Sequence, residues 1–406
     1  MSNVLAMTTS VQAPGRSDST APRLLTRNLL LICAADFGAM TSFYLLLSVV
    51  PSYAAASGGG DLGAGLTTGV MMLAAVVAET VTPRLAGRFG YRRSLVAGLV
   101  LLGFPTVWLA ASVSIGALVT VSLLRGIGFA IVVVATAGLA ASLAPPERRG
   151  EGLGLLGVVA NLPAVIALPT GVLLADAVGY PLALVVGAAT AVLGVCAVVR
   201  LPDDRTGTGE PLGLSAALRT PSLSRLFVIF AVVAMAGGIV ATFLPAALVH
   251  RFGSSCVSAA LLLQATAATF TRWWGGRWAD RHGARRLVVP SVLISAVGIA
   301  ALMFASNLVA VLAAALIFGT GFGIAQSATL NAMFDQVSTS GFGAVSGLWN
   351  LAYDSGFGAG AIAFGVLATQ IGYPGAFGAT ALVIVAVLPL AWTSRTRVGA
   401  PCLATC

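Results

Sequence analysis

Five charged side chains interrupt long apolar stretches of this 406-residue chain: Asp36, Glu79, Arg125, Arg272 and Asp354. If such stretches cross a bilayer, a charge near its centre costs about 2.5–3.5 kcal/mol on insertion scales, so each charge requires a reason. Three acids against two bases leave one acid that is able to be neutral and to exchange a proton. We therefore take the three acids as candidates for proton coupling and the two arginines as their charge partners within the membrane.

Polar and aromatic residues accompany these charges in the same stretches. The amides are uncharged companions of the five charges, and the aromatic rings could stack on an organic molecule. For the rings, packing against other helices is the alternative interpretation. The candidates for lining a substrate cavity are Phe43, Tyr44, Asn161, Gln264, Gln326, Trp349, Asn350 and Tyr353.

The composition indicates which elements must position these residues. Hydrophobic residues make up 58% of the chain and charged residues only 9%, against roughly 25% charged residues in an ordinary soluble domain. A soluble fold cannot cover that much apolar surface with polar side chains. A bilayer core of about 30 Å is instead crossed by a helix of roughly 20 apolar residues, and such runs recur along the whole sequence. We therefore expect an all-α integral membrane protein.

Twelve transmembrane helices are predicted, joined mostly by short loops, and a polar loop divides the chain near its middle. The expected spans are about 28–53, 64–84, 94–114, 116–143, 153–176, 180–200, 224–250, 255–275, 287–306, 308–333, 343–369 and 374–393. The predicted domains are a disordered cytoplasmic leader (1–27), an N-terminal six-helix half (28–200), a cytoplasmic central loop (201–223), a C-terminal six-helix half (224–393) and a cytoplasmic tail (394–406).

All positive side chains are arginines, and they cluster in alternate loops. Loops 84–93 and 277–286 carry four arginines each, whereas the intervening loops hold almost none apart from Arg251. This asymmetry follows the positive-inside rule, which places the Arg-rich loops and both termini in the cytoplasm. The formal charge of +9 therefore reflects topology and not nucleic-acid binding. We expect a multi-pass protein of the plasma or inner membrane that is a monomer surrounded by lipid.

An internal repeat relates the two predicted halves. A shift of 193 residues places RFGYRR (Arg88–Arg93) on RHGARR (Arg281–Arg286) and GIGF (Gly126–Phe129) on GTGF (Gly319–Phe322). The same shift places one GYP, at 179–181, on another, at 372–374. One constant offset for three separated motifs indicates a duplication. Six helices per half means that both halves enter the membrane from the same side, as parallel repeats.

The Arg-rich loop between the second and third predicted helices resembles a motif of the major facilitator superfamily, of the type G-x-L-a-D-R-x-G-R-R. The first copy has Pro83 and Gly87 where the motif has Gly and Asp, so Asp280 in the second copy is the better candidate for the family's cytoplasmic latch. The residues that match this gating motif are Arg88, Gly90, Arg92 and Arg93 in the first half and Gly276, Asp280, Arg281, Gly283, Arg285 and Arg286 in the second.

Two further segments carry the resemblance. LLRGIGF (Leu123–Phe129) resembles the family's helix-4 motif, with Arg125 as its intramembrane arginine. GVVANLPAVIALPTG (Gly157–Gly171) is similar to the family's Gly/Pro-rich antiporter motif, with Ala167 and Leu168 where Gly-Pro is expected. The resemblance covers residues 28–393 and implies two pseudo-symmetric six-helix halves around a central site.

The implied fold suggests partners for the charges. Helices 1 and 4 line the cavity in this family, so Asp36 is expected to pair with Arg125, either as a protonatable switch or as a permanent ion pair. Glu79 and Arg272 are equivalent under the repeat and are expected to pair across the halves, or else to reach water separately. The repeat mate of Asp354 is Asn161. Asp354 is expected to carry a proton, to contact a substrate, or to form an interhelical hydrogen bond.

The resemblance implies a secondary active transporter that works by alternating access. We expect proton-coupled efflux of a small organic molecule, a drug or a metabolite, with uptake of a small anionic metabolite as the alternative. A membrane-embedded enzyme is disfavoured because His250 and His282 lie at opposite sides of the membrane, and a sensor is disfavoured because a soluble output domain is absent. No cofactor, no metal ion and no enzymatic activity are expected.

Overall fold

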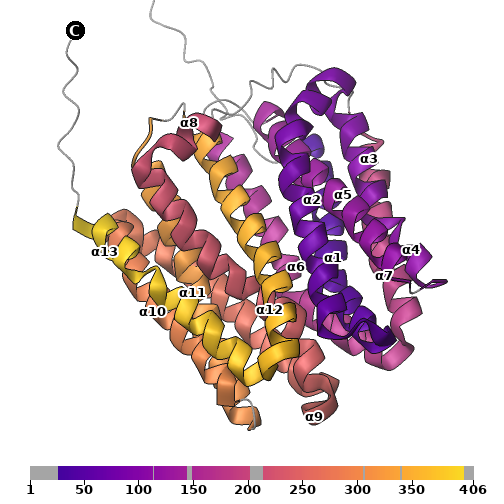
Figure 1. Cartoon of the computed structure of the whole chain (residues 1–406). Helices are drawn as coiled ribbons and strands as arrows, with labels where there is room; N and C mark the ends of the chain where they lie inside the picture. The colour runs from indigo at the N-terminus through magenta and orange to yellow at the C-terminus, as the bar shows by residue number, and fades with distance from the viewer. Residues whose placement is uncertain are drawn as a thin grey trace, which may run out of the picture.

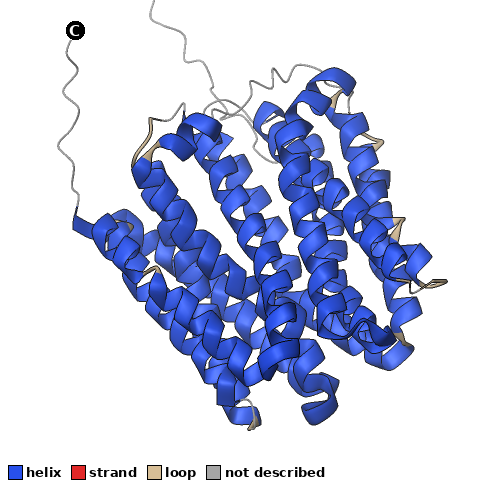
Figure 2. Ribbon diagram, in the orientation of Figure 1, coloured by secondary structure: helices blue, strands red, loops and turns tan. Residues whose placement is uncertain are grey.

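The computed structural model describes residues 26–112, 114–143, 149–201, 214–304, 307–338 and 341–396. These residues form helices joined by short turns, and no strand occurs among them (Figure 2). A π-helical turn (Ala55–Gly59) follows α1, and a 3-10 turn (Leu302–Phe304) follows α10. The helices are α1 (Arg27–Ala54), α2 (Gly60–Phe89), α3 (Tyr91–Gly103), α4 (Thr106–Leu109), α5 (Ile115–Leu143), α6 (Arg149–Val178), α7 (Tyr180–Val198), α8 (Leu214–Arg219), α9 (Pro221–His282), α10 (Arg285–Ala301), α11 (Leu308–Phe334), α12 (Phe342–Ala386) and α13 (Leu388–Thr396).

Within the described residues, nine helical segments are long and apolar enough to cross a membrane. Three of them, Arg27–Phe89, Pro221–His282 and Phe342–Trp392, have 63, 62 and 51 residues. A straight helix of 62 residues would be about 93 Å long, roughly three times the apolar thickness of a bilayer. Each of the three turns back at a non-helical break. Counting each as two crossings gives the number expected, and the all-helical membrane fold is confirmed.

Glycines with positive φ make these turns, and they recur at the spacing of the sequence repeat. A positive φ is strained for residues that carry a Cβ, so glycine is the residue that reverses the chain without a longer loop. Gly253 and Gly372, for example, interrupt α9 and α12 with φ of 80° and 69°. Three pairs separated by the shift of 193 residues adopt this conformation: Gly60 and Gly253, Gly90 and Gly283, and Gly179 and Gly372.

The helices gather in two sets, which Figure 1 shows as an indigo-to-magenta group (α1–α7) beside an orange-to-yellow group (α9–α13). The sets contact each other mainly where α2 packs on α12 and where α6 packs on α9. Gly358 of α12 lies at the first contact, because a Cβ there would press on the side chain of Met72. Small residues therefore allow the helices of the two sets to approach closely.

The glycines of GIGF and GTGF also serve close packing. A Cβ on Gly126 would overlap the carbonyl oxygen of Met71, and a Cβ on Gly319 would overlap that of Gln264. These two contacts are related by the shift of 193 residues. The repeated motif thus fixes how α5 packs on α2 and how α11 packs on α9.

The outer surface of the bundle is apolar. Leu382 and Val309 are each 71% exposed, and Leu193 is 67% exposed. In water such a surface would favour aggregation, whereas acyl chains solvate it in a bilayer. The chain is therefore a multi-pass membrane protein.

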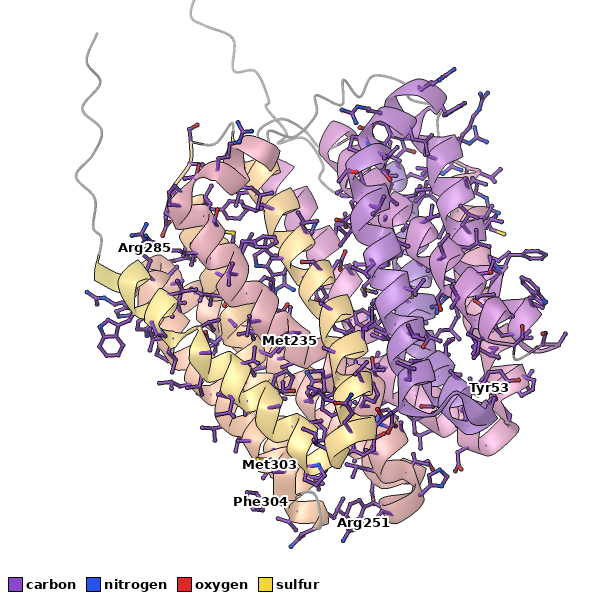
Figure 3. The ribbon with its side chains drawn as sticks, viewed as in Figure 1. Tyr53, Met235, Arg251, Arg285, Met303 and Phe304 are labelled. Atoms are coloured by element: carbon purple, nitrogen blue, oxygen red, sulfur yellow. The ribbon has the colours of Figure 1, made fainter. Side chains whose placement is uncertain are left out.

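Successive segments run in opposite directions, so the Arg-rich turns 84–93 and 277–286 lie at the same end of the bundle. Figure 3 shows Arg285 toward the upper end, with Arg251 and Phe304 at the lower end. Most of the predicted leader (1–27), central loop (201–223) and tail (394–406) lies outside the described residues. The division into the halves 28–200 and 224–393 stays a prediction.

Candidate functional site

A cavity of about 330 Å³ lies between the two sets of helices. Four elements of the first set (α1, α2, α5 and α6) and three of the second (α9, α11 and α12) contribute to its wall. Every predicted intramembrane residue except Arg125 lines this one cavity, and the residues are Asp36, Phe43, Tyr44, Glu79, Asn161, Gln264, Arg272, Gln326, Trp349, Asn350, Tyr353 and Asp354.

Two acids meet in this cavity from opposite sets of helices. The carboxyl groups of Glu79 on α2 and Asp354 on α12 are hydrogen-bonded to each other. Asp354 is buried, at 4% exposed, and Glu79 is half-buried. A hydrogen bond between two carboxyl groups requires that one of them carries a proton, because an ionised carboxylate only accepts. The two acids can therefore bond to each other only when one of them is protonated.

Arg272 of α9 has uncharged partners. Its Nη1 donates to Asn161 Oδ1 at 3.1 Å and to Gln326 Oε1 at 2.9 Å. Its guanidinium carbon lies 5.5 Å from the centroid of the Trp349 ring, within the range of a cation–π interaction. The predicted pairing of Arg272 with Glu79 is therefore wrong, because amides satisfy the arginine while Glu79 bonds to another acid.

The shift of 193 residues relates these two contacts. It carries Glu79 onto Arg272 and Asn161 onto Asp354, so the contact Glu79–Asp354 corresponds to the contact Arg272–Asn161. When two related halves pack around a two-fold axis, a residue meets its own repeat mate only if it lies on the axis. A residue away from the axis meets the repeat mate of some other residue. Equivalent charges were therefore unsuitable partners for each other.

Asp36 and Arg125 do not form the predicted pair. Thr136 Oγ1 of α5 donates to Asp36 Oδ1 at 3.3 Å, whereas Arg125 Nε donates to the Leu102 carbonyl oxygen at 3.3 Å. Thr136 lies about 16 Å further along α5 than Arg125, so the two charges sit at different depths. Both are 2% exposed. Asp36 Oδ2 and Arg125 Nη2 have no hydrogen-bond partner among the described residues.

Tyrosines from the two sets meet beside the acid pair. The hydroxyls of Tyr44 on α1 and Tyr353 on α12 lie close to each other. Trp349, one turn before Tyr353, stacks on Phe230 with 4.5 Å between ring centroids. Its Nε1 donates to Thr329 Oγ1 at 3.1 Å. These bonds fix the rings at the centre of the cavity.

The sequence prediction missed two aromatic residues of the cavity wall. Phe129 lines the cavity and stacks on Phe43 with 4.3 Å between ring centroids. Phe322 lines the cavity from α11. Both end the repeated GIGF and GTGF motifs, so the signal was present, although the glycines of these motifs suggested only packing. Thr136, the partner of Asp36, carried no such signal.

Side-chain hydrogen bonds also join the two sets at the end opposite the Arg-rich turns. Tyr373 of α12 donates to Asp61 Oδ1 of α2. Ser254 of α9 donates to Asp176 Oδ2 of α6 at 2.7 Å. Asp61 and Ser254 are equivalent under the shift of 193 residues. These two contacts lie near the turns at Gly58, Gly253 and Gly372. Tyr373 belongs to the repeated GYP motif, whereas the other three residues lie in no motif.

The residues of the predicted gating motif lie at the Arg-rich end. Asp280, Arg281 and Arg286 are exposed, and the guanidinium carbon of Arg88 lies 5.5 Å from the centroid of the Phe89 ring. Gly90 and Gly283 make the tight turn of each copy with φ of 90° and 88°. In the part of the chain that the structure describes, no group of three His, Cys, Asp or Glu side chains is arranged to hold a metal ion.

Similar solved structures share this architecture. A bacterial homolog of the human lysosomal transporter Spinster, in an inward-facing and occupied conformation, superposes with a TM-score of 0.79 at 17% identity, covering 92% of this chain and 98% of that one. The nucleoside transporter NupG superposes with a TM-score of 0.71 at 13% identity, covering 92% of this chain and all of that one, 100%. At these identities the likeness shows the fold.

Sequence relatives span nearly the whole chain. An uncharacterized MFS-type transporter of Methanocaldococcus jannaschii is 22% identical over 374 residues, 89% of this chain and 97% of that protein. A chloramphenicol resistance protein of Streptomyces lividans is 27% identical over 402 residues, 93% of this chain and 99% of that protein. The family model of the Major Facilitator Superfamily matches residues 32–360 and 226–402. The chain therefore belongs to the major facilitator superfamily of membrane transporters.

Proposed function

We propose that this transporter exports a small organic molecule in exchange for protons, by rocking the helices of residues 28–200 against those of residues 224–393. The observation that carries the proposal is the hydrogen bond between Glu79 and Asp354, two acids from opposite sets of helices. Alternating access requires contacts between the halves that form on one side of the cycle and break on the other.

The acid pair is suited to couple protonation to this movement. Two carboxylates at hydrogen-bonding distance cannot both stay ionised, because their charges repel strongly where water is scarce. With one proton the pair holds α2 against α12, and without it the pair pushes them apart. Asp36 is a second candidate for proton transfer, because it lines the same cavity from α1.

The cavity supports a small organic substrate. Its volume of about 330 Å³ falls within the range of small-molecule sites, which are largely apolar with a few polar groups. Phe43, Phe129 and Phe322 supply apolar rings, and Gln264 and Asn350 supply amides. The similarity to a chloramphenicol resistance protein supports export. We place the protein in the plasma or inner membrane as a monomer, with the Arg-rich end in the cytoplasm.

A second candidate function is the uptake of a small anionic metabolite. Arg272 lines the cavity, and its hydrogen bonds go to the uncharged oxygens of Asn161 and Gln326. Among the described residues, no acid in direct contact therefore neutralises its positive charge. A carboxylate or phosphate of a substrate would supply that charge.

The test uses the purified protein in vesicles of both orientations, with an imposed pH gradient and a panel of neutral, cationic and anionic compounds. For export, inverted vesicles with an acidic lumen should accumulate the substrate as protons leave. Asp354→Asn and Asp36→Asn are compared with Asp335→Asn, which removes an exposed acid at the end of α11. Undiminished pH-driven transport in both cavity variants would refute the proton roles. Accumulation of an anion in right-side-out vesicles only would favour uptake.

A further inference from the structure

The central cavity is lined by two opposite charges that come from different sets of helices. Asp36 belongs to α1 of the first set, and Arg272 belongs to α9 of the second. Asp36 lies about 14 Å along α1 from Arg27, and Arg272 lies about 15 Å along α9 from His282. Both of these helix ends belong to the Arg-rich end of the bundle. The two charges therefore face the cavity at a similar depth.

The carboxylate of Asp36 has one oxygen that the protein does not satisfy. Thr136 Oγ1 donates to its Oδ1, whereas its Oδ2 has no hydrogen-bond partner in the described part of the chain. The side chain is almost completely buried, so bulk water does not replace the missing donor. A buried, ionised oxygen without a donor is costly. A cationic group of a ligand would supply both the hydrogen bond and the opposite charge.

Arg272 presents the complementary requirement. Its Nη1 donates to the side-chain oxygens of Asn161 and Gln326, and its guanidinium lies over the ring of Trp349. These contacts hold the guanidinium in place but use only one of its nitrogens. Within the described residues, its Nε and Nη2 make no hydrogen bond. A carboxylate of a ligand accepts hydrogen bonds from two such nitrogens side by side.

Aromatic rings line the cavity near both charges. Phe43 lies about two turns along α1 from Asp36 and stacks on Phe129 of α5, and both rings line the cavity. Tyr44, next in the chain to Phe43, is close enough to interact electrostatically with both Asp36 and Arg272. The acid and the arginine therefore belong to one region of the cavity, and apolar rings form part of its wall.

We propose that this cavity binds a zwitterion, a small molecule with an ammonium group at one end, a carboxylate at the other and an apolar body between them. The ammonium group donates to Asp36 Oδ2, and the carboxylate accepts from Nε and Nη2 of Arg272. The inference rests on the proposed function, because it takes the cavity as the substrate site of a carrier, and it names the class of substrate. A ligand with a single charge would leave either the acid or the arginine without a counterpart.

The experiment measures binding to the purified full-length protein at constant pH, without a gradient. The probes are para-(aminomethyl)benzoic acid, which carries both charges, its methyl ester, which carries only the ammonium group, its N-acetyl derivative, which carries only the carboxylate, and the N-acetyl methyl ester, which carries neither. Isothermal titration calorimetry gives the Kd of each probe. The zwitterion should bind about tenfold or more tightly than either singly charged probe, since each of these lacks one charge-assisted contact.

Two variants should each remove one half of this preference. In Asp36→Asn the zwitterion and the N-acetyl derivative should bind equally, because the ammonium group no longer meets an acid. In Arg272→Gln the zwitterion and the methyl ester should bind equally, because the carboxylate no longer meets a guanidinium.

Two control variants remove the same charges from exposed positions that do not line the cavity. Asp335→Asn changes an acid at the end of α11. Arg277→Gln changes an arginine whose guanidinium lies over the ring of Trp273. Both controls should keep the order of affinities of the unaltered protein. Size-exclusion profiles of all variants check that each remains folded.

Four results would overturn the proposal. The unaltered protein could fail to bind the zwitterion, or could bind a singly charged probe as tightly. A cavity variant could weaken all four probes by the same factor, which would assign its residue a structural role. A control could change the order of affinities as a cavity variant does, which would mean that surface charge sets the preference.

Failure of the proposed function would give a different result. In that case a pH gradient would drive no transport of para-(aminomethyl)benzoic acid in vesicles, while the order of affinities in detergent stayed as expected. Conversely, pH-driven transport of the N-acetyl methyl ester, together with equal affinities for all four probes, would support proton coupling and refute the zwitterion site.

Discussion

The two contacts that the repeat relates, Glu79–Asp354 and Arg272–Asn161, occupy corresponding places between the halves but differ in chemistry. The first brings together two acids. The second joins a guanidinium to an amide oxygen at 3.1 Å and includes Gln326 at 2.9 Å. One contact changes with pH, whereas the other keeps the same charge at all physiological pH values, because arginine stays protonated.

The difference suggests a division of work between two interfaces that started as copies. In the mechanism that we propose, a proton at α2–α12 decides whether the helices attract or repel each other. At α6–α9 a fixed charge remains available to orient a substrate or to keep the helices together. Such a carrier needs one contact that responds to protons and one that does not. Two copies of the same interface provide both when the side chains at two equivalent positions differ.

The largest expected effect comes from removing the titratable contact. Glu79→Gln and Asp354→Asn should each reduce pH-driven transport by about 5- to 150-fold, the range of typical coupling free energies. The double variant should be little worse than either single one, because the two acids act as a unit. The thermal stability of the unaltered protein should fall as pH rises, since the contact requires a proton, and it should be less sensitive to pH in the double variant. Additive losses would contradict a shared proton.

Moving the acid to the corresponding position tests whether the two contacts are interchangeable. Adding Asn161→Asp to Asp354→Asn keeps the number of acids but places the new carboxylate beside Arg272. That carboxylate should pair with the guanidinium and stay ionised. Proton coupling should therefore not return, as measured by pH-driven uptake in vesicles. Full recovery of uptake would show that the position of the acid does not matter.

Removing the fixed charge should give a smaller effect on binding. Arg272→Gln loses charge-assisted hydrogen bonds, each worth about 1.5–3 kcal/mol, and the KM of an anionic substrate should rise about tenfold or more. Gln326→Leu, which keeps the arginine, should change the KM less. Transport should stay dependent on pH in both variants, because the acid pair remains. A complete loss of the pH dependence would show that Arg272 also takes part in proton coupling, and the two contacts would then not have separate roles.

The smallest effect is expected at the end opposite the Arg-rich turns. Asp61→Asn and Ser254→Ala each weaken one hydrogen bond between the sets, worth about 0.5–1.5 kcal/mol. Hydrogen exchange should increase by about two- to tenfold beside the bond that each variant weakens. For Asp61→Asn these are the first turns of α2 and residues 361–373, and for Ser254→Ala they are the helical turns around Ser254 and Asp176. Thr41→Ala, which removes an exposed hydroxyl bonded within its own helix, is the control. Unchanged exchange would show that packing alone closes this end.

The sequence alone predicted much of the fold and the membership of the central cavity. Apolar runs, the Arg pattern and the constant shift between motifs indicated a duplicated helical membrane protein, because each reflects an energetic rule that acts locally along the chain. Twelve intramembrane candidates line one cavity because polar groups that face lipid are costly. That rule says which way a residue must face, but not which residue it meets.

Partners were harder to predict, because pairing depends on depth and on the relation between the halves. Arg125 and Thr136 lie on nearly the same face of α5, and only their different depth assigns Asp36 to the threonine. Glu79 and Arg272 are opposite in charge and equivalent in sequence, yet the two-fold relation separates them. The hydrogen bond of Asp61 with Tyr373 joins residues far apart in the chain, and although Tyr373 lies in the repeated GYP motif, Asp61 lies in no motif.

The breaks inside Arg27–Phe89, Pro221–His282 and Phe342–Trp392 consist of a few residues around a glycine, with hardly any linker between consecutive crossings. Such connections are too short to let the two helices of each hairpin slide past each other. In any conformational cycle, each of these helical hairpins must therefore move as a rigid body that rotates about its turn. An insertion of flexible residues at Gly253 would uncouple the arms without touching the cavity.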